Sequence, residues 1–442
     1  MRIDSKRRTI AALMAVVCLM LSAPAAEAAK PAAQFSSDLA VRWFSLLHGV
    51  IKTEKLNPVV ASRVIGYSSV AFYEALAPGM PHHRSLVGQL NELDSLQAVR
   101  PGRNFDWPSV ANAAMARTLR AFFAAATPDS LAQINALELE IASARQAAVK
   151  SKLQSVSAAQ GRAVADAVLA WAGGDGFATA NNCPFTPPAG PGLWVPTLPL
   201  FKPALQPCWG QLRPFVLSSG GECAPPPPPA YSIDPSSEFY AQANEVFTTV
   251  NTLTPVQEEI ALFWSDDPGP PGTPPGHWVS IVNQLAVRDG YTLEEAAEAY
   301  ARVGIAVADA FISCWQVKFQ HNLLRPITYI QSVFNPAWLP LLATPAFPEY
   351  TSGHSVQSGA AAQTLTDMLG DVAFTDHTHD ARGLAPRSFA SFAAAADEAA
   401  ISRLYGGIHY REAIAKGLEQ GRCIAGAIRD RVIFRKDQEP ED

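Results

Sequence analysis

Basic side chains, histidines and a Ser-Gly pair gather in three short clusters within the last third of the 442-residue chain. The clusters are Lys318-x6-Arg325-Pro326, Ser352-Gly353-His354 and Ser402-Arg403-x5-His409. A phosphate-like anion is bound by guanidinium groups, an ammonium group and backbone N–H groups at a helix start. Histidine titrates near neutral pH, so one ring can bond the central atom of such an anion while another moves protons. The sequence therefore predicts an oxyanion pocket, with His409 and His354 as these two histidines.

The first cluster lies at the end of a predicted helix that begins after Thr292. A Thr-x-x-Glu capping pattern starts there, and an Ala-rich run of helical periodicity follows. Trp315 and Lys318 are three residues apart and share one side of this helix, with Arg325 about two turns further along. We expect Pro326 to end the helix, because proline disfavours the α region at the residue before it.

Glycines shape the other two clusters. Gly353 permits a turn before a helical run over residues 354–369, and the start of such a helix is a natural anion site. A Gly-Gly pair interrupts the chain between Arg403 and His409. We therefore expect Arg403 on a loop and His409 at the start of the following helix.

The three-part pattern resembles the signature shared by vanadium-dependent haloperoxidases and the type 2 phosphatidic acid phosphatase superfamily, which includes soluble bacterial acid phosphatases. The intervals from Pro326 to Ser352 and from His354 to Ser402 are also similar to those of the family. A wider likeness to bacterial haloperoxidase-related proteins extends through residues 263–267 and 273–278.

This resemblance implies a role for each site residue. His409 would be the vanadate ligand of a haloperoxidase or the nucleophile of a phosphatase, and His354 the acid–base residue. Contacts to the oxyanion would come from Lys318, Arg325, Ser352, Gly353 and Arg403. Lys318 would also polarise bound peroxide, and Asp266 or Asp267 would pair with an active-site arginine. Vanadate accepts a fifth ligand and mimics phosphoryl transfer, so one pocket fits both chemistries.

Two positions depart from the family pattern. Thr351 stands where the family usually has proline, and Ala413 stands where an aspartate often orients the last histidine. A histidine that ligates a metal normally donates its other ring nitrogen to such a partner. Glu412, Glu398 and a backbone carbonyl are the open choices for the acceptor at His409.

Two aromatic residues favour a haloperoxidase over a phosphatase. In haloperoxidases similar to the fungal type, one aromatic precedes the lysine by three residues and another precedes the serine by five; Trp315 and Phe347 occupy these positions. An apolar wall would strip water from a halide, whereas a phosphatase pocket must admit a hydrated ester. The predicted function is therefore oxidation of halide by hydrogen peroxide with a vanadate cofactor. The alternatives are an acid phosphatase that hydrolyses phosphomonoesters without a cofactor, and a catalytically silent binding protein.

His377, His379 and Asp380 resemble a metal cluster by residue type. Their surroundings, residues 374–386, have the composition of an exposed loop. No third or fourth ligand with a recognisable spacing accompanies them. The sequence therefore does not predict a metal site there.

Residues 1–28 have the pattern of a signal peptide. Four basic residues precede an apolar run from Thr9 to Leu21, and Ala26-Glu27-Ala28 offers a small-residue cleavage site. The run is too short for a membrane span, so we expect export to the periplasm or the extracellular space.

Export permits disulfides. Three cysteines lie in one Pro-rich region, and a Cys208–Cys223 bridge is the favoured pair there. Cys314 and Cys423 lie in helical, apolar stretches and are expected to be free core thiols.

The helical patterns predict an all-α protein. Residues 29–180 and 236–436 are expected to form two helical bundles, similar to the family's pair of four-helix bundles. Residues 181–235 form a Pro- and Gly-rich irregular segment, and residues 437–442 a tail. The segment should pack over the bundles, because it contains the large aromatics Trp194, Phe201, Trp209 and Phe215. With 48% hydrophobic residues and a net charge of −6, the chain gives no indication of nucleic-acid binding and leaves the oligomeric state open.

Overall fold

The computed structural model describes residues 30–96 and 104–437, so the predicted signal peptide lies outside the described residues. The first half contains α1 (Asp38–Thr53), α2 (Pro58–Leu76), α3 (Trp107–Phe122), α4 (Pro128–Ala148), α5 (Ser151–Gly173) and α6 (Phe177–Ala180). The second half contains α7 (Glu238–Asn251), α8 (Pro255–Phe263), α9 (Pro274–Arg288), α10 (Leu293–His321), α11 (Pro326–Val333), α12 (Gly353–Leu369), α13 (Phe392–Tyr405) and α14 (Arg411–Arg431). The short strands β1 (Phe374–Asp376) and β2 (Arg387–Phe389) pair antiparallel. The expected all-α fold is confirmed.

The helix starts follow from local sequence. A capping side chain with a proline in the first turn begins α2, α3, α4, α8 and α9, because proline fits that turn without losing a hydrogen bond. Thr292 and Glu295 form the expected capping box at α10. This helix ends at His321, where Asn322 adopts a left-handed conformation (φ 48°). Pro326 therefore does not end α10 as expected; it begins α11.

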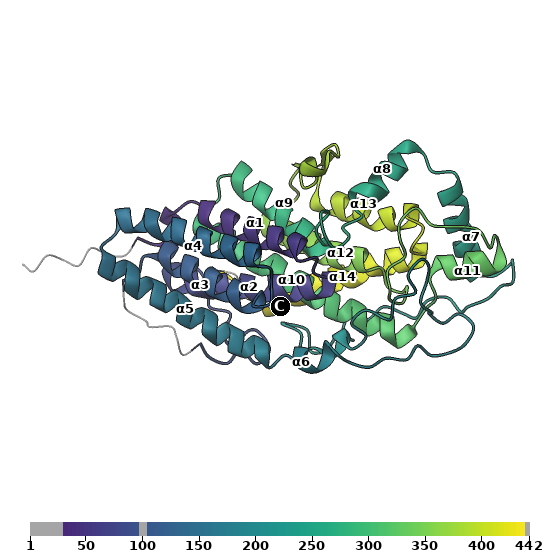
Figure 1. Cartoon of the computed structure of the whole chain (residues 1–442), viewed down its shortest axis with the longest axis horizontal. Coiled ribbons are helices and arrows are strands. Elements are labelled where there is room, and N and C mark those ends of the chain that lie inside the picture. The colour runs from purple at the N-terminus through teal and green to yellow at the C-terminus, as the bar shows by residue number, and fades with distance from the viewer. Residues whose placement is uncertain (1–29, 97–103, 438–442) are drawn as a thin grey trace, which may run out of the picture.

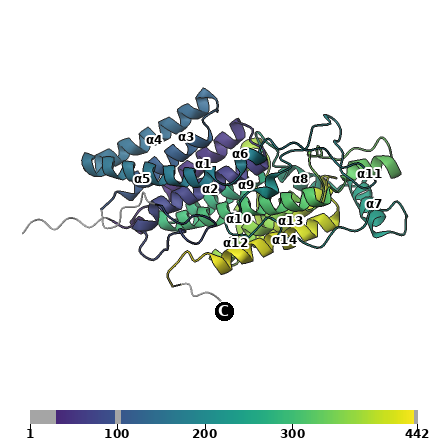
Figure 2. The ribbon, with the colours of Figure 1, turned by 90° about the horizontal axis from the view of Figure 1, so that it is seen from below.

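Helix α10 runs through the middle of the molecule, with α3, α4 and α5 at one end and α7 and α11 at the other (Figures 1 and 2). It packs against α2, α9 and α12, and α12 packs against α14. The approach of α2 is close because Gly304 faces it: a Cβ there would lie 2.4 Å from Ser69 Oγ. One hydrophobic cluster extends from Ala32 to Phe434, so helices of both halves share a core. The boundaries of the two bundles stay a prediction.

The irregular segment over residues 181–235 packs on this core, as expected. Trp194, Trp209 and Phe215 are buried, although Phe201 is 59% exposed, so the expectation of burial is wrong there. Asp309 of α10 anchors the segment, since its carboxylate accepts the backbone N–H groups of residues 215, 216 and 217 at 2.6, 2.9 and 3.1 Å.

The disulfides differ from the expected pairing. Cys183 bonds Cys208, and Cys223 bonds Cys423 across 200 residues. Neither the Cys208–Cys223 bridge nor a free Cys423 is therefore correct, whereas Cys314 is free and buried as expected. The observed pairing depends on tertiary structure. Helix α14 packs alongside the irregular segment, where its Arg431 also pairs with Glu222. Within the described residues, no helix is both long and apolar enough to cross a membrane.

Candidate oxyanion-binding active site

His409 lies between α13 and α14 and is 3% exposed. Its Nδ1 is 2.7 Å from Glu349 Oε1, which also accepts the backbone N–H of Tyr410 at 2.9 Å. Its Nε2 is 3.2 Å from Arg325 Nη1. A guanidinium only donates, so Nε2 carries the lone pair and Nδ1 carries the proton given to Glu349. Burial and the charges of Arg325 and Lys318 hold the pKa of His409 well below its usual value. The ring is therefore neutral, with Nε2 available as a ligand or nucleophile.

Glu349 is the acceptor that sequence reasoning missed. Glu412 and Glu398 do not fill this position; Glu398 instead pairs with Arg387 and accepts from Trp264 Nε1. Glu349 is fully buried, and burial raises its pKa to about 7 against the opposing charges of Lys318 and Arg325. The sequence did contain a signal for this partner: Glu349 lies in an apolar run just before the Ser-Gly-His motif. A glutamate buried with such a run is rarely unpaired, so it was a candidate acceptor.

Arg325 occupies the position just before α11 and is completely buried. Its Nε donates to the Phe347 carbonyl and its Nη1 to the Ile408 carbonyl, both at 2.8 Å. Its Nη2 has no hydrogen-bond partner among the described residues. Burial lowers its pKa to about 10, so the guanidinium stays charged at neutral pH.

Lys318 is also completely buried, and its ammonium group donates to three backbone carbonyls, those of Pro348, Glu349 and Thr351. It therefore fixes the loop that carries Glu349 and leads into Ser352. Burial lowers the pKa of Lys318 to about 7, with Arg325 lowering it further and Glu349 opposing the shift.

Ser352 caps α12, with its Oγ accepting the N–H of Ser355 at 3.4 Å. Its own N–H donates to the carbonyl of Ala413 at 3.0 Å, so the position that departs from the family pattern supports the loop through its backbone. Helix α14 approaches closely because of Gly417, where a Cβ would lie 2.6 Å from the Cβ of Ser355. The N–H groups of the first turn of α12 have no acceptor within the helix and are suited to an anion.

His354 follows in that first turn, with a side chain that is 16% exposed. Its Nε2 has no hydrogen-bond partner within the described part of the chain and lies 3.8 Å from Asp266 Oδ2. Burial and the charge of Arg403 hold the pKa of His354 well below its usual value, so the ring is neutral.

Arg403 lies in the last turn of α13, on a helix and not on a loop as expected. It donates to Ser402 Oγ at 3.0 Å and to the carbonyl of Trp264. Among the described residues, neither Asp266 nor Asp267 forms an ion pair with an arginine; Asp266 contacts histidines instead. Burial lowers the pKa of Arg403 to about 10, and the charges of Asp266 and Asp267 oppose this from a distance.

Trp315 and Phe347 form one apolar wall, with ring centroids 4.8 Å apart. Lys318 Nζ lies 5.1 Å and Arg325 Cζ 4.8 Å from the centroid of Phe347. The irregular segment reaches this wall, because the indole N–H of Trp315 donates to the Leu205 carbonyl at 3.1 Å.

The structure brings residues of the three clusters together, since Arg325 Nη1 lies 3.2 Å from His409 Nε2 and the charges of Lys318, Arg403 and His354 also lower the pKa of His409. Arg325 is the cation in contact with this ring, and Glu349 is the carboxylate in contact with it. Buried charge requires compensation, and Arg325 Nη2 and His354 Nε2 lack partners in the described structure. The residues therefore fit a tetrahedral oxyanion such as vanadate or phosphate.

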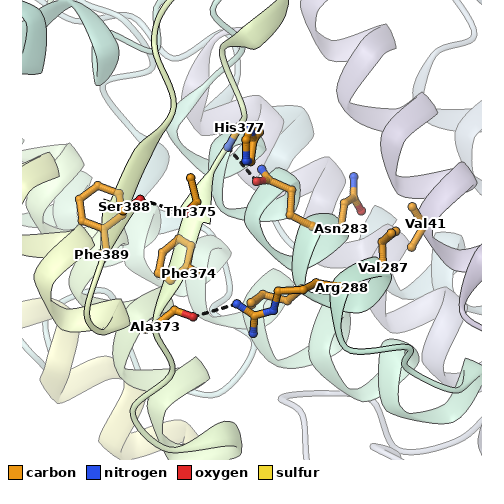
Figure 3. A pocket seen from close by; sticks show the side chains of 12 residues that line it. Val41, Asn283, Val287, Arg288, Ala373, Phe374, Thr375, His377, Ser388 and Phe389 are labelled. Atoms are coloured by element: carbon orange, nitrogen blue, oxygen red, sulfur yellow. Dashed lines mark hydrogen bonds between the residues drawn. The ribbon is translucent and has the colours of Figure 1, made fainter.

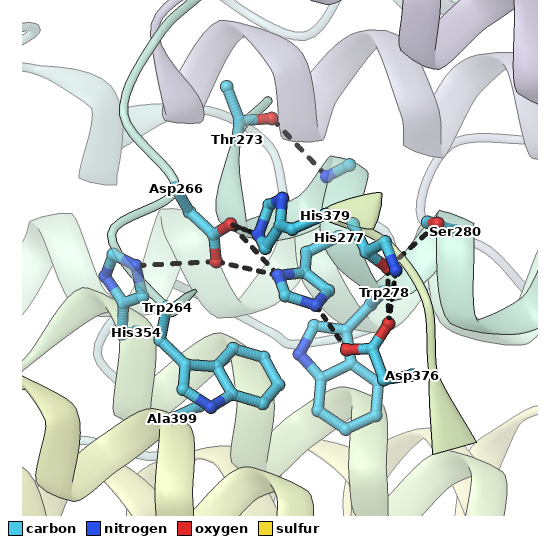
Figure 4. A network of polar contacts seen from close by, with 12 residues as sticks. Trp264, Asp266, Thr273, His277, Trp278, Ser280, His354, Asp376, His379 and Ala399 are labelled. Carbon is cyan, nitrogen blue, oxygen red and sulfur yellow. Dashed lines mark hydrogen bonds and ion pairs between the residues drawn. The ribbon is translucent and has the colours of Figure 1, made fainter. Parts of the chain in front are cut away.

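Residues 374–386 are only partly the exposed loop that the sequence predicted. Asp376 and His379 of this hairpin are buried beside the pocket, whereas His377 is exposed and pairs with Asp380. Figure 4 shows Asp376 and His379 facing His277 and Asp266, with His354 on the far side of Asp266.

Comparisons with known proteins agree with this geometry. Residues 334–435 match the family described as the VCPO second helical-bundle domain. The chain is 30% identical to vanadium chloroperoxidase of Curvularia inaequalis over 139 residues, which are 25% of this chain and only 22% of that protein. It is also similar to the crystal structure of the first bacterial vanadium-dependent iodoperoxidase, with 35% identity and a TM-score of 0.84 over 91% of this chain and 98% of that one. A holo-type bacterial vanadium-dependent chloroperoxidase shares the fold at 14% identity and a TM-score of 0.67, over 85% of this chain and 92% of that one.

Proposed function

Because the chain belongs to the vanadium-dependent haloperoxidases, we propose that it binds vanadate at His409 Nε2 and uses hydrogen peroxide to oxidise halide to hypohalous acid. The observation that carries this proposal is the neutral His409 tautomer, with its Nε2 lone pair among buried cations. Vanadate held there would supply a Lewis acid that activates peroxide at a constant oxidation state. The overall reaction consumes one halide, one peroxide and one proton and yields hypohalous acid and water.

The protein side chains would contribute binding, orientation and proton transfer. Arg325 and Arg403 would neutralise the oxyanion, with Arg325 Nη2 as a donor that is free to reach it. The first N–H groups of α12, at Gly353 and His354, would add donors, and Ser352 would fix this turn. Glu349 would hold the Nδ1 proton of His409 and so keep Nε2 basic.

His354 is suited to move the proton. Its ring is neutral, partly exposed and unpartnered at Nε2 in the described structure, so this atom could take a proton from peroxide and return one to the leaving hydroxide. Lys318 would act by charge and by fixing the loop over residues 348–351, because carbonyls already use its three donors. Trp315 and Phe347 would exclude water from the halide.

A second candidate function is phosphomonoester hydrolysis. The same Nε2 lone pair of His409 could attack phosphorus, and His354 could protonate the leaving alcohol. The apolar wall of Trp315 and Phe347 disfavours this alternative, because a hydrated ester would have to enter there.

The test is a paired assay of vanadate-free protein. Oxidation of chloride, bromide and iodide by hydrogen peroxide is measured with and without orthovanadate, alongside hydrolysis of a phosphomonoester. We expect oxidation that requires vanadate and is inhibited by phosphate, and loss of it in His409→Ala but not in His377→Ala, whose histidine is exposed. Hydrolysis that vanadate inhibits, without any oxidation, would overturn the proposal in favour of the phosphatase.

We also propose that the protein is exported. The Cys183–Cys208 and Cys223–Cys423 disulfides support this, because such bonds persist in oxidising compartments. Fractionation of the producing cell would place the protein in the periplasm or medium, and a purely cytoplasmic protein would contradict export.

A further inference from the structure

A second cluster of metal-ligand side chains lies beside the oxyanion pocket, formed by Asp266, His277 and His379 (Figure 4). The three residues are 2%, 0% and 1% exposed. They come from separate parts of the chain: the loop before α9, the first turns of α9, and the β1–β2 hairpin. One ligand atom from each lies within 4.8 Å of the others.

The distances around Asp266 suit a small divalent ion. Asp266 Oδ1 is 3.0 Å from His277 Nδ1 and 3.4 Å from His379 Nε2. Ligands at about 2.1 Å from a tetrahedral zinc ion lie about 3.4 Å from one another. Two of the three separations are therefore close to those of a zinc site.

Asp376 supplies the supporting contact that a ligating histidine normally has. It accepts from His277 Nε2 at 2.6 Å, which leaves Nδ1 of that ring directed at Asp266. Asp376 is itself held by the hydroxyl of Thr378 at 2.6 Å and by Gln284 at 3.3 Å. A carboxylate behind a histidine fixes the tautomer and strengthens the ring as a metal ligand.

The position of His379 favours a metal ion over an extra proton on His277 as the positive charge in this cluster. A doubly protonated His277 could satisfy both Asp266 and Asp376 without any metal. His379 would still be buried with Nδ1 unpartnered among the described residues and with Nε2 making only a long contact, 3.4 Å from Asp266 Oδ1. A buried polar group without a good hydrogen bond costs about 1–3 kcal/mol, and a proton on His277 does not improve the long contact of His379, whereas an ion at its Nε2 would.

Charge also favours the ion. A doubly protonated His277 carries one positive charge between two buried carboxylates, so these three groups keep one uncompensated negative charge. A divalent cation bound by a His277 that has released its Nδ1 proton to solvent brings the same three groups to neutrality. A surface pocket lies between α9 and the hairpin (Figure 3). Gln284, which donates to Asp376, is one of its lining residues, so the network approaches solvent on that side.

We propose that Asp266, His277 and His379 bind a first-row divalent transition-metal ion such as Zn²⁺, next to the oxyanion pocket. Three protein ligands leave a fourth position for water. Asp266 joins the two sites, because its other oxygen faces His354.

The test measures Zn²⁺ binding to untagged, chelator-treated, vanadate-free protein by calorimetry, and Co²⁺ binding by visible absorption. We expect one Zn²⁺ per chain and a Co²⁺ spectrum of low coordination number. His379→Gln should abolish this binding, and Asp376→Asn should weaken it by about 10–100-fold. The matched control is His377→Gln, two residues away but exposed, which should bind like the parent.

Circular dichroism and thermal unfolding would verify that each variant is folded, with His277→Gln as the second ligand variant. His409→Ala should retain Zn²⁺. This result would show that Zn²⁺ does not bind in the oxyanion pocket, and it would hold even if the proposed haloperoxidase function were wrong. Absence of stoichiometric binding to the parent, or equal loss in His377→Gln and His379→Gln, would overturn the proposal.

Discussion

Replacing Glu349 by glutamine should change which oxyanion the pocket prefers. In the parent, Glu349 Oε1 accepts from His409 Nδ1 at 2.7 Å and from the Tyr410 N–H at 2.9 Å. A glutamine oxygen can accept both bonds, so the ring keeps its orientation, but a neutral acceptor supports a basic Nε2 less well. Loss of such a supporting partner typically costs about 10–100-fold in ligand affinity.

A second effect acts in the opposite direction. Removing the carboxylate also removes its repulsion of a bound anion, which at roughly 7 Å and an effective dielectric constant of about 20 amounts to about 2 kcal/mol. The two effects on vanadate are therefore similar in size and partly cancel. Phosphate has the same shape and a similar charge, so it experiences the same change in repulsion without a bond to Nε2.

The ratio of the two dissociation constants isolates the contribution of His409. In Glu349→Gln, the ratio of the vanadate Kd to the phosphate Kd should rise by about 10–100-fold, with phosphate bound more tightly than in the parent. Competition calorimetry on vanadate-free protein measures both constants. Glu412→Gln is the matched control, because this glutamate does not contact His409. An unchanged ratio in a folded Glu349→Gln protein, or the same change in Glu412→Gln, would refute the reasoning.

Three further predictions follow from other contacts. Sulfate keeps its charge near neutral pH, so its affinity should fall about tenfold or more as pH rises from about 6 to 8, because Lys318 loses its proton and Glu349 gains a negative charge near pH 7; the Lys318→Met/Glu349→Gln double variant should show little pH dependence in the same titration. Opening the Cys223–Cys423 bridge should destabilise the fold by about 5 kcal/mol and opening Cys183–Cys208 by about 3.5 kcal/mol, because their loops span 200 and 25 residues; urea unfolding of the paired serine variants checks this order. Asp309→Ala should cost at least about 3 kcal/mol and make residues 214–217 sensitive to protease, since three buried N–H groups lose their acceptor, whereas Asp309→Asn should cost less.

The helices and the convergence of the three clusters could be predicted because their determinants are local. The capping box at Thr292 and the helical run to His321 depend on residues close in sequence, and the structure has both. Ser352, Gly353 and Arg325 were recognisable because the motif spacing specifies residue type as well as position. The start of α10 and the bounds of α12 follow from the same local patterns.

The partners of these residues could not be predicted, because they come from distant segments. Glu349 reaches His409 across 60 positions, and Cys223 reaches Cys423 across 200. The hairpin over residues 374–386 has a polar composition typical of a loop, yet Asp376 is buried because His277 of α9 faces it. Composition does not reveal such pairing. The cost of burying each charged side chain is offset by a partner that comes close only in the folded chain.

The hydrogen bond from Trp315 to the Leu205 carbonyl lies where the site passes from packed helices to the irregular segment. The oxyanion contacts come from helices and from a loop fixed by Lys318, whereas the irregular segment reaches the site at its apolar wall. Loops tolerate insertion and substitution better than packed helices. Natural variation or a directed library confined to this segment can therefore alter access and substrate range while leaving the anion ligands in place.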